Sequence, residues 1–537
     1  MATANKVEAV QEKKPNIFVR MGRSIANSFK KLGNSIGEFF GSFGRMFKNG
    51  SWGTKLSFLI FGAGSFSHKQ IIKGILFLGL QALFFAYMIM CPAVVGPGGV
   101  LVPTGWKSLA NLALGGTEGG FNPETLVIDP PSNSQLMLLF GLVTIAIIIL
   151  YLIIWRANIK SSYIADTAVK EGKKPTTFVE DIKALGDNRF HILMLTPTCL
   201  AALVFTLLPT IFMICMAFTT YNDLDMQASG TALFHWNGVQ NFGYMFSGEG
   251  ALGYEISNRF FPVLGWTVIW AIFATFTCYF GGIILALLIN KKGLKGKKVF
   301  RTIFVLTIAI PQFISLLAMR NLLSNAGPIN NLIVNVFHWS STPISFLGLE
   351  STGNNVYLAR VMVIVINMWL GIPYTMLMTS GILMNIPEDL YEAAKVDGTG
   401  TFKMFFKITF PYIFFITTPY LISSFIGNIN SFNTIFLLTG GGPSVGSFKA
   451  GETDLLVTWL YKLTIENGEY NTGAVIGILT FLITATITLI TYRHSNAYKE
   501  EDTFQWAQTQ KLVKRNIVLK RSRKLQALQL PTLSLLY

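Results

Sequence analysis

The chain has 537 residues, a mean hydropathy of +0.49 and only 13% charged residues. These values exclude an ordinary soluble domain of this length, because such domains carry about 25% charged residues. Windows of about twenty mostly apolar residues, the length that crosses a bilayer, predict an all-α polytopic membrane protein with eight transmembrane helices. They lie at residues 71–92, 135–155, 192–218, 263–289, 302–323, 357–384, 411–437 and 472–492.

Lys and Arg residues gather in alternate loops, the pattern that sets the orientation of a membrane protein. The loops at 1–70, 157–191, 291–301, 385–410 and 493–537 carry 35 of them, and the intervening loops carry four. Both termini are therefore expected in the cytoplasm. The first window lacks a signal-peptide pattern and is expected to remain as an anchor. The net charge of +16 then reflects topology, so no nucleic-acid partner is expected.

Basic segments flank the spans at both ends of the chain. Between Ile17 and Phe47, apolar residues recur every three to five positions, which favours an amphipathic element on the inner membrane surface; a partner-binding role stays open. The tail from Arg493 is expected to be solvated or apposed to the membrane. The expected divisions are a basic amphipathic N-terminal segment (1–70), two additional transmembrane helices (71–156), a cytoplasmic linker (157–191), a six-span core (192–492) and a basic tail (493–537).

Charged groups at membrane depth, which ion-driven transporters generally need, are scarce in this sequence. Asp and Glu are absent from all eight windows. Sodium sites can be built from backbone carbonyls, so ion coupling is disfavoured but stays open. The Gly- and Lys-rich run at 293–298 does not have the spacing of a P-loop. If transport is active, its energy is expected to come from another subunit.

No catalytic residue and no metal site are expected. The four cysteines and five histidines are scattered over spans and loops, without the spacing of a metal site or a redox pair. Burial as small apolar residues is the expected role of the cysteines.

Uncharged polar residues and a small glycine interrupt three of the windows. They are Gln312 in the fifth window, Asn367, Gly371 and Tyr374 in the sixth, and Ser424, Asn428 and Ser431 in the seventh. Within the sixth and seventh windows, steps of three or four residues place them on one helix face. Uncharged donors and acceptors beside aromatic rings suit a neutral polyhydroxylated ligand. Such residues also hold membrane helices together, and both explanations stay open.

The segment 385–411, between the sixth and seventh windows, predicts a helix, a glycine break and a second helix. Pro387 favours a helix start, and Gly398 favours a sharp stop. Three phenylalanines would lie mainly on one side of the second helix: Phe402, Phe405 and Phe406. An apolar surface on a cytoplasmic elbow favours docking of another protein, and packing against the chain's own helix ends is the alternative.

The same elbow carries a specific pattern. Its residues are Glu392, Ala393, Ala394, Gly398, Ile408 and Pro411. The pattern resembles the EAA loop of permease subunits of ATP-binding-cassette (ABC) importers, in the form typical of carbohydrate permeases. LLTGGGP at 437–443 and TDLLVTWLYKL at 453–463 are similar to segments of that family, and the likeness covers roughly residues 190–502. Two spans ahead of a six-span core resemble the maltose and maltodextrin permeases of the MalF type.

The resemblance implies a six-helix type I ABC importer permease core, with an ABC transmembrane type-1 domain at about 263–492 and an EAA coupling loop at 385–411. In this family the loop fits a cleft in the ATPase subunit. The implied coupling residues are Glu392, Ala393, Ala394, Asp397, Gly398, Ile408 and Pro411. A midmembrane sugar site is also implied, and the residues expected to bind substrate are Asn367, Leu370, Gly371, Tyr374, Asn428, Ser431 and Gln312.

The resemblance further implies a binding-protein-dependent sugar importer in the bacterial inner membrane. The implied partners are a second, MalG-like permease subunit, an ATP-binding-cassette ATPase dimer and an extracytoplasmic sugar-binding protein. The implied substrate is a sugar, with maltose or maltodextrin expected first. ATP and Mg would sit on the ATPase, so this chain is expected to bind no cofactor. An ion-coupled secondary sugar transporter is the alternative, and a membrane scaffold without transport is a third possibility.

Overall fold

The computed structural model describes residues 33–494, except 36, 91–92, 96–100, 115–119, 123–126, 130–132, 223–232, 249, 292, 350–354 and 444–449. Residues 1–32 of the predicted amphipathic N-terminal segment and almost all of the basic tail therefore lie outside the described residues. The chain divides into two compact units. Unit 1 comprises residues 1–212 and 231–233, and unit 2 comprises 213–230 and 234–537. Each unit is described by itself.

The predicted membrane-spanning architecture is confirmed. Among the residues that the structure describes, seven helices are long and apolar enough to cross a membrane, or up to eight with one bent pair. The spans are Ile71–Met90, Ser134–Lys170, Phe190–Met216, Ile256–Asn290, Val356–Leu383, Thr401–Ile429 and Tyr470–Arg493, with the bent pair Lys297–Ala309 and Gln312–Leu322. Each matches one predicted window.

Unit 1 contains the first two spans and most of the third. Its helices are α2 (Trp52–Leu56), α3 (Ala63–Ser67), α4 (Ile71–Phe85) with the π-helical turn η1 (Ala86–Met90), α5 (Gly105–Leu114), α6 (Ser134–Lys170), α7 (Phe178–Gly186), α8 (Phe190–Ala202), η3 (Leu203–Leu207) and α9 (Leu208–Met216). Two antiparallel hairpins, which the sequence did not suggest, pair β1 (Ala93–Val95) with β2 (Leu101–Pro103) and β3 (Gly120–Asn122) with β4 (Val127–Asp129).

A buried polar stripe extends α6 beyond its apolar window. Asn158 Oδ1 accepts a hydrogen bond from the backbone N–H of Gly62 at 2.9 Å. Two turns later, Asp166 accepts one from Thr54 Oγ1 at 2.5 Å and lies 2.5 Å from His68 Nε2. These bonds to the segment that carries α2 and α3 satisfy polar groups that burial would otherwise penalise. The predicted linker thus begins as the last turns of a long helix.

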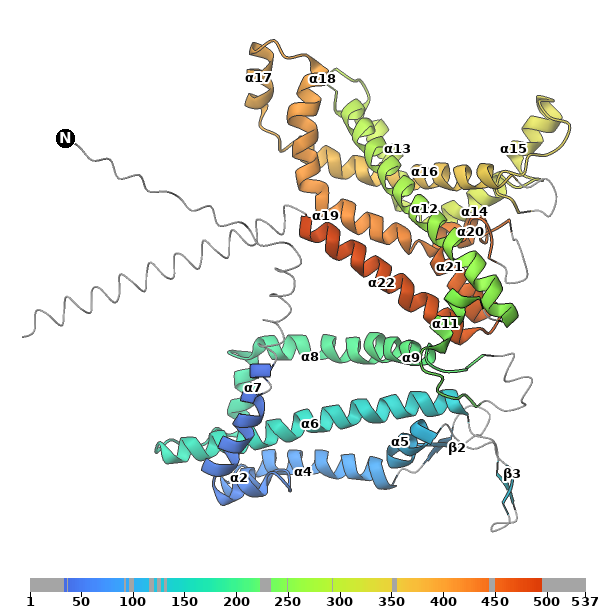
Figure 1. Cartoon of the computed structure of the whole chain (residues 1–537). Helices are drawn as coiled ribbons and strands as arrows, with labels where there is room; N and C mark the ends of the chain where they lie inside the picture. The colour runs from blue at the N-terminus through green and yellow to red at the C-terminus, as the bar shows by residue number, and fades with distance from the viewer. Residues whose placement is uncertain are drawn as a thin grey trace, which may run out of the picture. The chain divides into compact units, whose positions relative to one another are not determined.

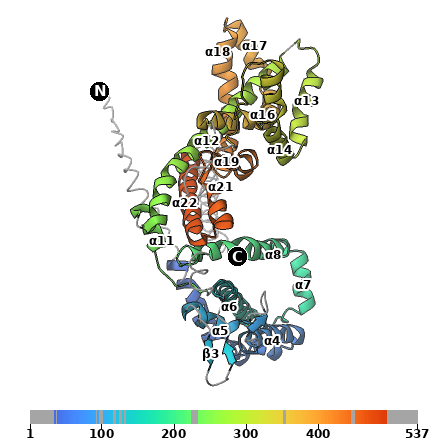
Figure 2. The same cartoon turned by 90° about the vertical axis from the view of Figure 1, so that its right-hand side faces the viewer.

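Unit 2 is a helical assembly (Figures 1 and 2). Its helices are α11 (Gln240–Ser247), α12 (Gly250–Asn290), α13 (Lys297–Ala309), α14 (Gln312–Leu322), α15 (Pro328–Asn331), η4 (Leu332–Val336), α16 (Val356–Leu383), α17 (Glu388–Val396), α18 (Thr401–Met404), η5 (Phe405–Thr409), α19 (Phe410–Ile429), α20 (Phe432–Leu438), α21 (Leu456–Tyr461), η6 (Lys462–Glu466) and α22 (Tyr470–His494). Helix α12 packs along α16 and also against α19.

A proline breaks the fifth predicted window. Pro311 disfavours helical geometry at the residue before it, and Ile310 is extended, with ψ of 128°. Helices α13 and α14 therefore meet at 95°. The break places Gln312 at the first position of α14.

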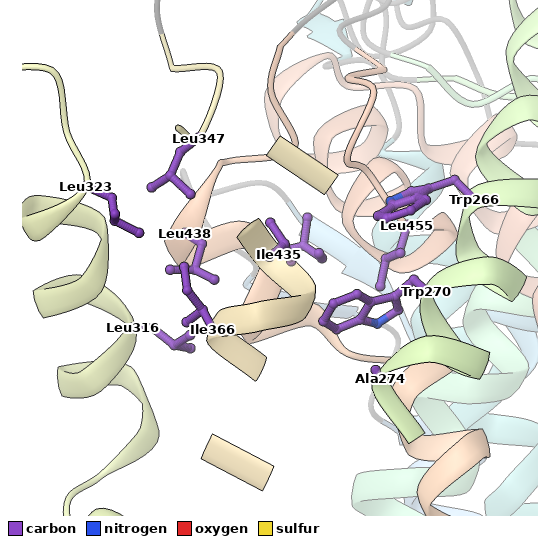
Figure 3. Close-up of a cluster of buried hydrophobic side chains, with 11 residues drawn as sticks. Trp266, Trp270, Ala274, Leu316, Leu323, Leu347, Ile366, Ile435, Leu438 and Leu455 are labelled. Carbon is purple, nitrogen blue, oxygen red and sulfur yellow. The ribbon is translucent and has the colours of Figure 1, made fainter. Parts of the chain in front are cut away.

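A large apolar core of unit 2 joins four helices and two loops (Figure 3). Its buried residues are Trp266, Trp270, Ala274, Leu316, Leu323, Leu347, Val363, Ile366, Ile435, Leu438 and Leu455. They come from α12, α14, α16 and α20 and from the chain around residues 347 and 455. This core fixes the helices that carry most of the predicted substrate-binding residues.

Candidate functional site

The elbow between α16 and α19 has the predicted helix–glycine–helix form. Helix α17 ends at Val396, and Gly398 adopts φ of +68°, a left-handed conformation that glycine enters without steric cost. The backbone N–H of Thr399 donates to Ala394 O at 2.9 Å, which closes the helix end. Helices α18, η5 and α19 then run on without a break as one span. Both views show α17 and α18 at one end of unit 2 (Figures 1 and 2).

The two alanines of the EAA pattern differ in burial. Ala394 is buried, whereas Ala393 and Glu392 are exposed. The Tyr391 hydroxyl lies 2.9 Å from Thr409 Oγ1, so a hydrogen bond ties α17 to the π-helical turn η5. The other predicted coupling residues are Asp397, Gly398 and Pro411, which are exposed, and Ile408, which is half-buried.

The three phenylalanines of the elbow divide between the two predicted roles, which are docking of another protein and packing against the chain's own helices. Phe402 is 82% exposed and Phe406 is 59% exposed. Phe405 instead packs into the chain's own core, with its ring centroid 5.9 Å from that of Phe410. Val396, on the first arm, is also exposed. The elbow therefore offers a small apolar surface while one of its aromatics anchors it.

Asn367 and Gly371 lie where α16 packs closely against α12. The Asn367 amide nitrogen donates to Cys278 Sγ at 3.5 Å, and the Cys278 thiol donates to Asn367 O at 3.6 Å. A Cβ atom at position 371 would collide with the same sulfur. Both residues therefore hold α16 against α12, as the helix-packing explanation requires.

Tyr374 is oriented differently from its predicted neighbours on the helix. Its side chain is exposed, and its ring centroid lies 5.8 Å from that of Tyr420 on α19. The Tyr420 hydroxyl is 3.3 Å from Thr375 Oγ1. This pair of tyrosines presents an uncharged aromatic and hydroxyl surface. Tyr420 was missed by sequence reasoning, because nothing local in its sequence signals a partner on α16.

The predicted residues of the fifth and seventh windows meet through a threonine. Gln312 Nε2 and Ser431 Oγ both donate to Thr434 Oγ1, at 3.5 and 3.0 Å. Asn428 Nδ2 donates to Thr275 Oγ1 on α12 at 2.9 Å. The structure therefore brings Gln312 and Ser431 together, while Asn428 is held by α12. Thr434 was missed, although its three-residue step from Ser431 is a usable signal.

Leu370 and the nearby exposed groups complete the predicted set. Leu370 is half-buried against the large apolar core. Gln312 is exposed, and Asn428 and Ser431 are half-buried. The predicted set thus contains buried packing residues and accessible uncharged polar groups, and only the second kind can contact a ligand directly in this conformation.

A buried polar cluster joins the two further motifs of the sequence. Gly441 adopts φ of +83°, and a Cβ atom there would collide with the carboxylate of Asp454. Asp454 accepts from Lys462 Nζ at 2.6 Å and from Thr458 Oγ1 at 2.9 Å. The Thr439 and Thr453 hydroxyls lie 2.8 Å apart. Burial raises the pKa of Asp454, and the nearby Lys462 ammonium opposes that shift. The glycine run is therefore a close-packed turn.

Beside this cluster, one carboxylate links two arginines. Glu452 Oε2 lies 3.0 Å from Arg360 Nη2, and Glu452 Oε1 lies 3.3 Å from Arg259 Nη1. The Arg360 guanidinium also stacks on Trp266, 4.6 Å from the ring centroid. Arg360 thus has a partner ninety-two residues away in the sequence, which local charge patterns did not reveal.

Comparison with known proteins identifies the family. A family model described as "Binding-protein-dependent transport system inner membrane component" matches residues 278–497. The chain is 32% identical over 447 residues to the galactooligosaccharides transport system permease protein GanP of Bacillus subtilis, covering 82% of this chain and 97% of GanP. The chain belongs to this family of transport permeases. The maltodextrin permease MdxF of the same organism is 31% identical over 447 residues, covering 83% of this chain and 95% of MdxF.

A second kind of relative within the permease family matches the chain more closely over a shorter part. The maltose/maltodextrin permease MalF of Salmonella typhimurium is 37% identical over 263 residues, which cover 47% of this chain and 48% of MalF. The chain is thus the multi-pass inner-membrane permease component of an ABC transporter and not its ATPase. Permeases of this family carry no cofactor, and ATP hydrolysis belongs to a separate subunit.

Proposed function

We propose that this permease carries a neutral oligosaccharide into the cell, with maltose or maltodextrin as the first candidate. The observation that carries the proposal is the set of relatives, which are named for galactooligosaccharides, maltodextrin and maltose. The accessible members of the predicted set, Gln312, Tyr374, Asn428 and Ser431, carry uncharged amides and hydroxyls, which suits a ligand that offers only hydroxyl groups.

The sugar would contact the accessible groups, and the buried ones would hold the helices that carry them. Tyr374, Gln312, Asn428 and Ser431 are proposed as substrate contacts, because each is exposed or half-buried. Asn367, Leu370 and Gly371 would instead set the position of α16 on which Tyr374 is carried. A tyrosine ring offers an apolar face for the sugar ring and a hydroxyl for its edge.

The elbow would receive the ATPase. Its proposed contact surface consists of Glu392, Ala393 and Asp397 with the exposed side chains Val396 and Phe402. The continuous helix from α18 to α19 offers a stiff lever between that surface and Asn428. Closure of two ATPase subunits on ATP would push the elbow and favour the outward-open state of the sugar site, as alternating access requires.

The complete importer would contain further subunits. We propose a second, MalG-like permease subunit beside this one, two ATPase subunits on the cytoplasmic side and an extracytoplasmic sugar-binding protein on the other. The family description names a binding-protein-dependent system, which supports the last of these partners. The Lys and Arg distribution supports cytoplasmic termini and a cytoplasmic elbow.

Reconstitution of the whole complex in liposomes tests the proposed substrate. Maltodextrins, galactooligosaccharides and an anionic oligosaccharide would each be added with the binding protein on its side of the membrane. ATP would be supplied on the opposite side, where the ATPase subunits lie. We expect uptake of at least one neutral oligosaccharide and none of the anionic one. Uptake of the anionic oligosaccharide would overturn the proposal. So would a complex that takes up no neutral oligosaccharide although its ATPase responds to the binding protein.

A further inference from the structure

The excursion between α14 and α16 presents apolar side chains to the outside of the molecule. Trp339 is 76% exposed, Val336 57%, Phe337 51% and Leu332 44%. The rings of Phe337 and Trp339 stack, with centroids 4.8 Å apart. We call these four residues the aromatic tip. Exposed apolar residues that cluster in this way mark interaction surfaces more often than isolated ones do.

An ordered frame holds the aromatic tip. Asn330 is buried, and its amide nitrogen donates to Ser324 O at 3.0 Å and to Ile344 O at 2.9 Å, while its Oδ1 accepts from the Ile344 N–H at 2.8 Å. The backbone N–H of Trp339 donates to Ile333 O at 2.9 Å. These bonds fix both sides of the excursion, so the exposed position of the tip is set by the fold.

The backbone turns sharply at the residue just before Trp339. His338 has φ of +52°, which is uncommon for a residue other than glycine and costs energy. Its Nδ1 lies 2.9 Å from Val334 O. A strained turn that leaves a tryptophan outside the core, instead of burying it, points to a favourable environment for that ring outside this chain.

The chemistry of the tip selects a lipid surface as that environment. Between Arg320 and Glu350 the sequence contains no Asp, Glu, Lys or Arg, so the tip has no charge with which to recognise a charged protein partner. Leu332 and Val336 cannot form side-chain hydrogen bonds, which a sugar site needs. Tryptophan is enriched where a membrane meets water, with neighbouring aliphatic groups buried in the acyl region.

The position of the tip agrees with such a role. Figure 1 shows α15, which leads into the tip, beyond the right-hand end of α16, whereas α17 and α18 follow the other end of that span. If the elbow is cytoplasmic, as the proposed function requires, the tip lies at the outer surface. We propose that the aromatic tip inserts into the outer lipid interface and anchors the outer end of the bent span.

A site-specific fluorophore tests this insertion. Trp339→Cys, and as a matched control Thr342→Cys on the same loop, would be labelled with an environment-sensitive dye in the full complex in phosphatidylcholine nanodiscs. Thr342 is exposed but lies outside the tip. We expect a blue shift and quenching by nitroxide lipids at position 339, and quenching by aqueous iodide at position 342. Val336→Cys gives a second probe if the tryptophan variant fails to assemble, and the unsubstituted chain gives the background.

Each other occupant has its own signature and would overturn the proposal. Iodide quenching at 339 as strong as at 342 would mean that the tip is solvated. Protection from both quenchers would mean that another subunit covers it, and a change on adding the sugar-binding protein would mean that this protein docks there. The proposed topology is tested separately with an impermeant maleimide on Thr342→Cys in intact cells. Lack of labelling there would contradict the outer location of this loop.

Discussion

At the scale of single residues, Gly441 shows how one position can require glycine twice. Its left-handed backbone would cost a side-chain residue about 1–2 kcal/mol, and its Cβ would collide with Asp454. Gly440 has φ of +58°, but a Cβ added there would meet no other atom within 4 Å. A side chain at position 440 would therefore meet backbone strain alone, whereas one at position 441 would meet both strain and a steric collision.

We expect Gly441→Ala to lower the thermal unfolding midpoint of the purified complex much more than Gly440→Ala does. The first substitution adds a collision inside a buried ion-paired cluster, whereas the second adds backbone strain alone. Fluorescence-detected thermal unfolding of both variants measures the difference. Equal midpoints would show that Asp454 moves aside freely and that the cluster is not rigid.

Tyr374 and Asn367 form a second residue-scale comparison, because the same helix exposes one and buries the other. Tyr374→Ala should change stability by no more than about 0.5 kcal/mol, as is usual at exposed positions. It should raise the sugar concentration for half-maximal uptake roughly tenfold, which corresponds to about 1.4 kcal/mol of lost binding. Asn367→Ala removes the amide that donates to Cys278 Sγ, while the thiol keeps its bond to the backbone carbonyl of residue 367. This loss should cost about 0.5–1.5 kcal/mol of stability. Uptake assays and thermal unfolding of each variant decide between ligand contact and helix packing.

At the scale of elements, the elbow was predictable because its signals are local. A proline start, a glycine stop and a second helix after the break follow from the residues themselves. The side each phenylalanine faces was not predictable, because it depends on Phe410 and on the core that α12, α16 and α19 assemble. The same limit applies to Asn367, whose burial is decided by Cys278 on a different helix.

The different exposure of Phe402 and Phe405 gives a prediction for the elbow. Phe402→Ala should weaken binding of the ATPase while the permease pair remains stable, because Phe402 is exposed. Phe405→Ala should lower stability by up to about 1.5–3 kcal/mol, because Phe405 packs in the core. Co-purification of the ATPase and the unfolding temperature of the permease pair measure the two effects. Full ATPase binding by the Phe402 variant would remove that residue from the proposed docking surface.

At the scale of the whole molecule, the apolar windows predicted the spans but not how far each helix continues. Helix α6 runs to Lys170 because a polar stripe, and not an apolar one, buries its last turns. The fifth window is bent by 95° at a proline whose effect on direction depends on its neighbours. Hydropathy reports where a chain meets lipid, so it cannot report polar helix extensions or the angle of a break.

The energy source is a property of the assembled importer and gives the last prediction. Asp and Glu are absent from the eight apolar windows, and the acidic residue of α6 that the structure buries, Asp166, is already held by Thr54 and His68. A transporter without a free carboxylate at membrane depth is poorly equipped for proton coupling. Sugar uptake by cells should therefore survive a protonophore while ATP is maintained, and stop when ATP hydrolysis by the partner ATPase is abolished. Uptake that collapses with the proton or sodium gradient at constant ATP would instead establish a secondary transporter.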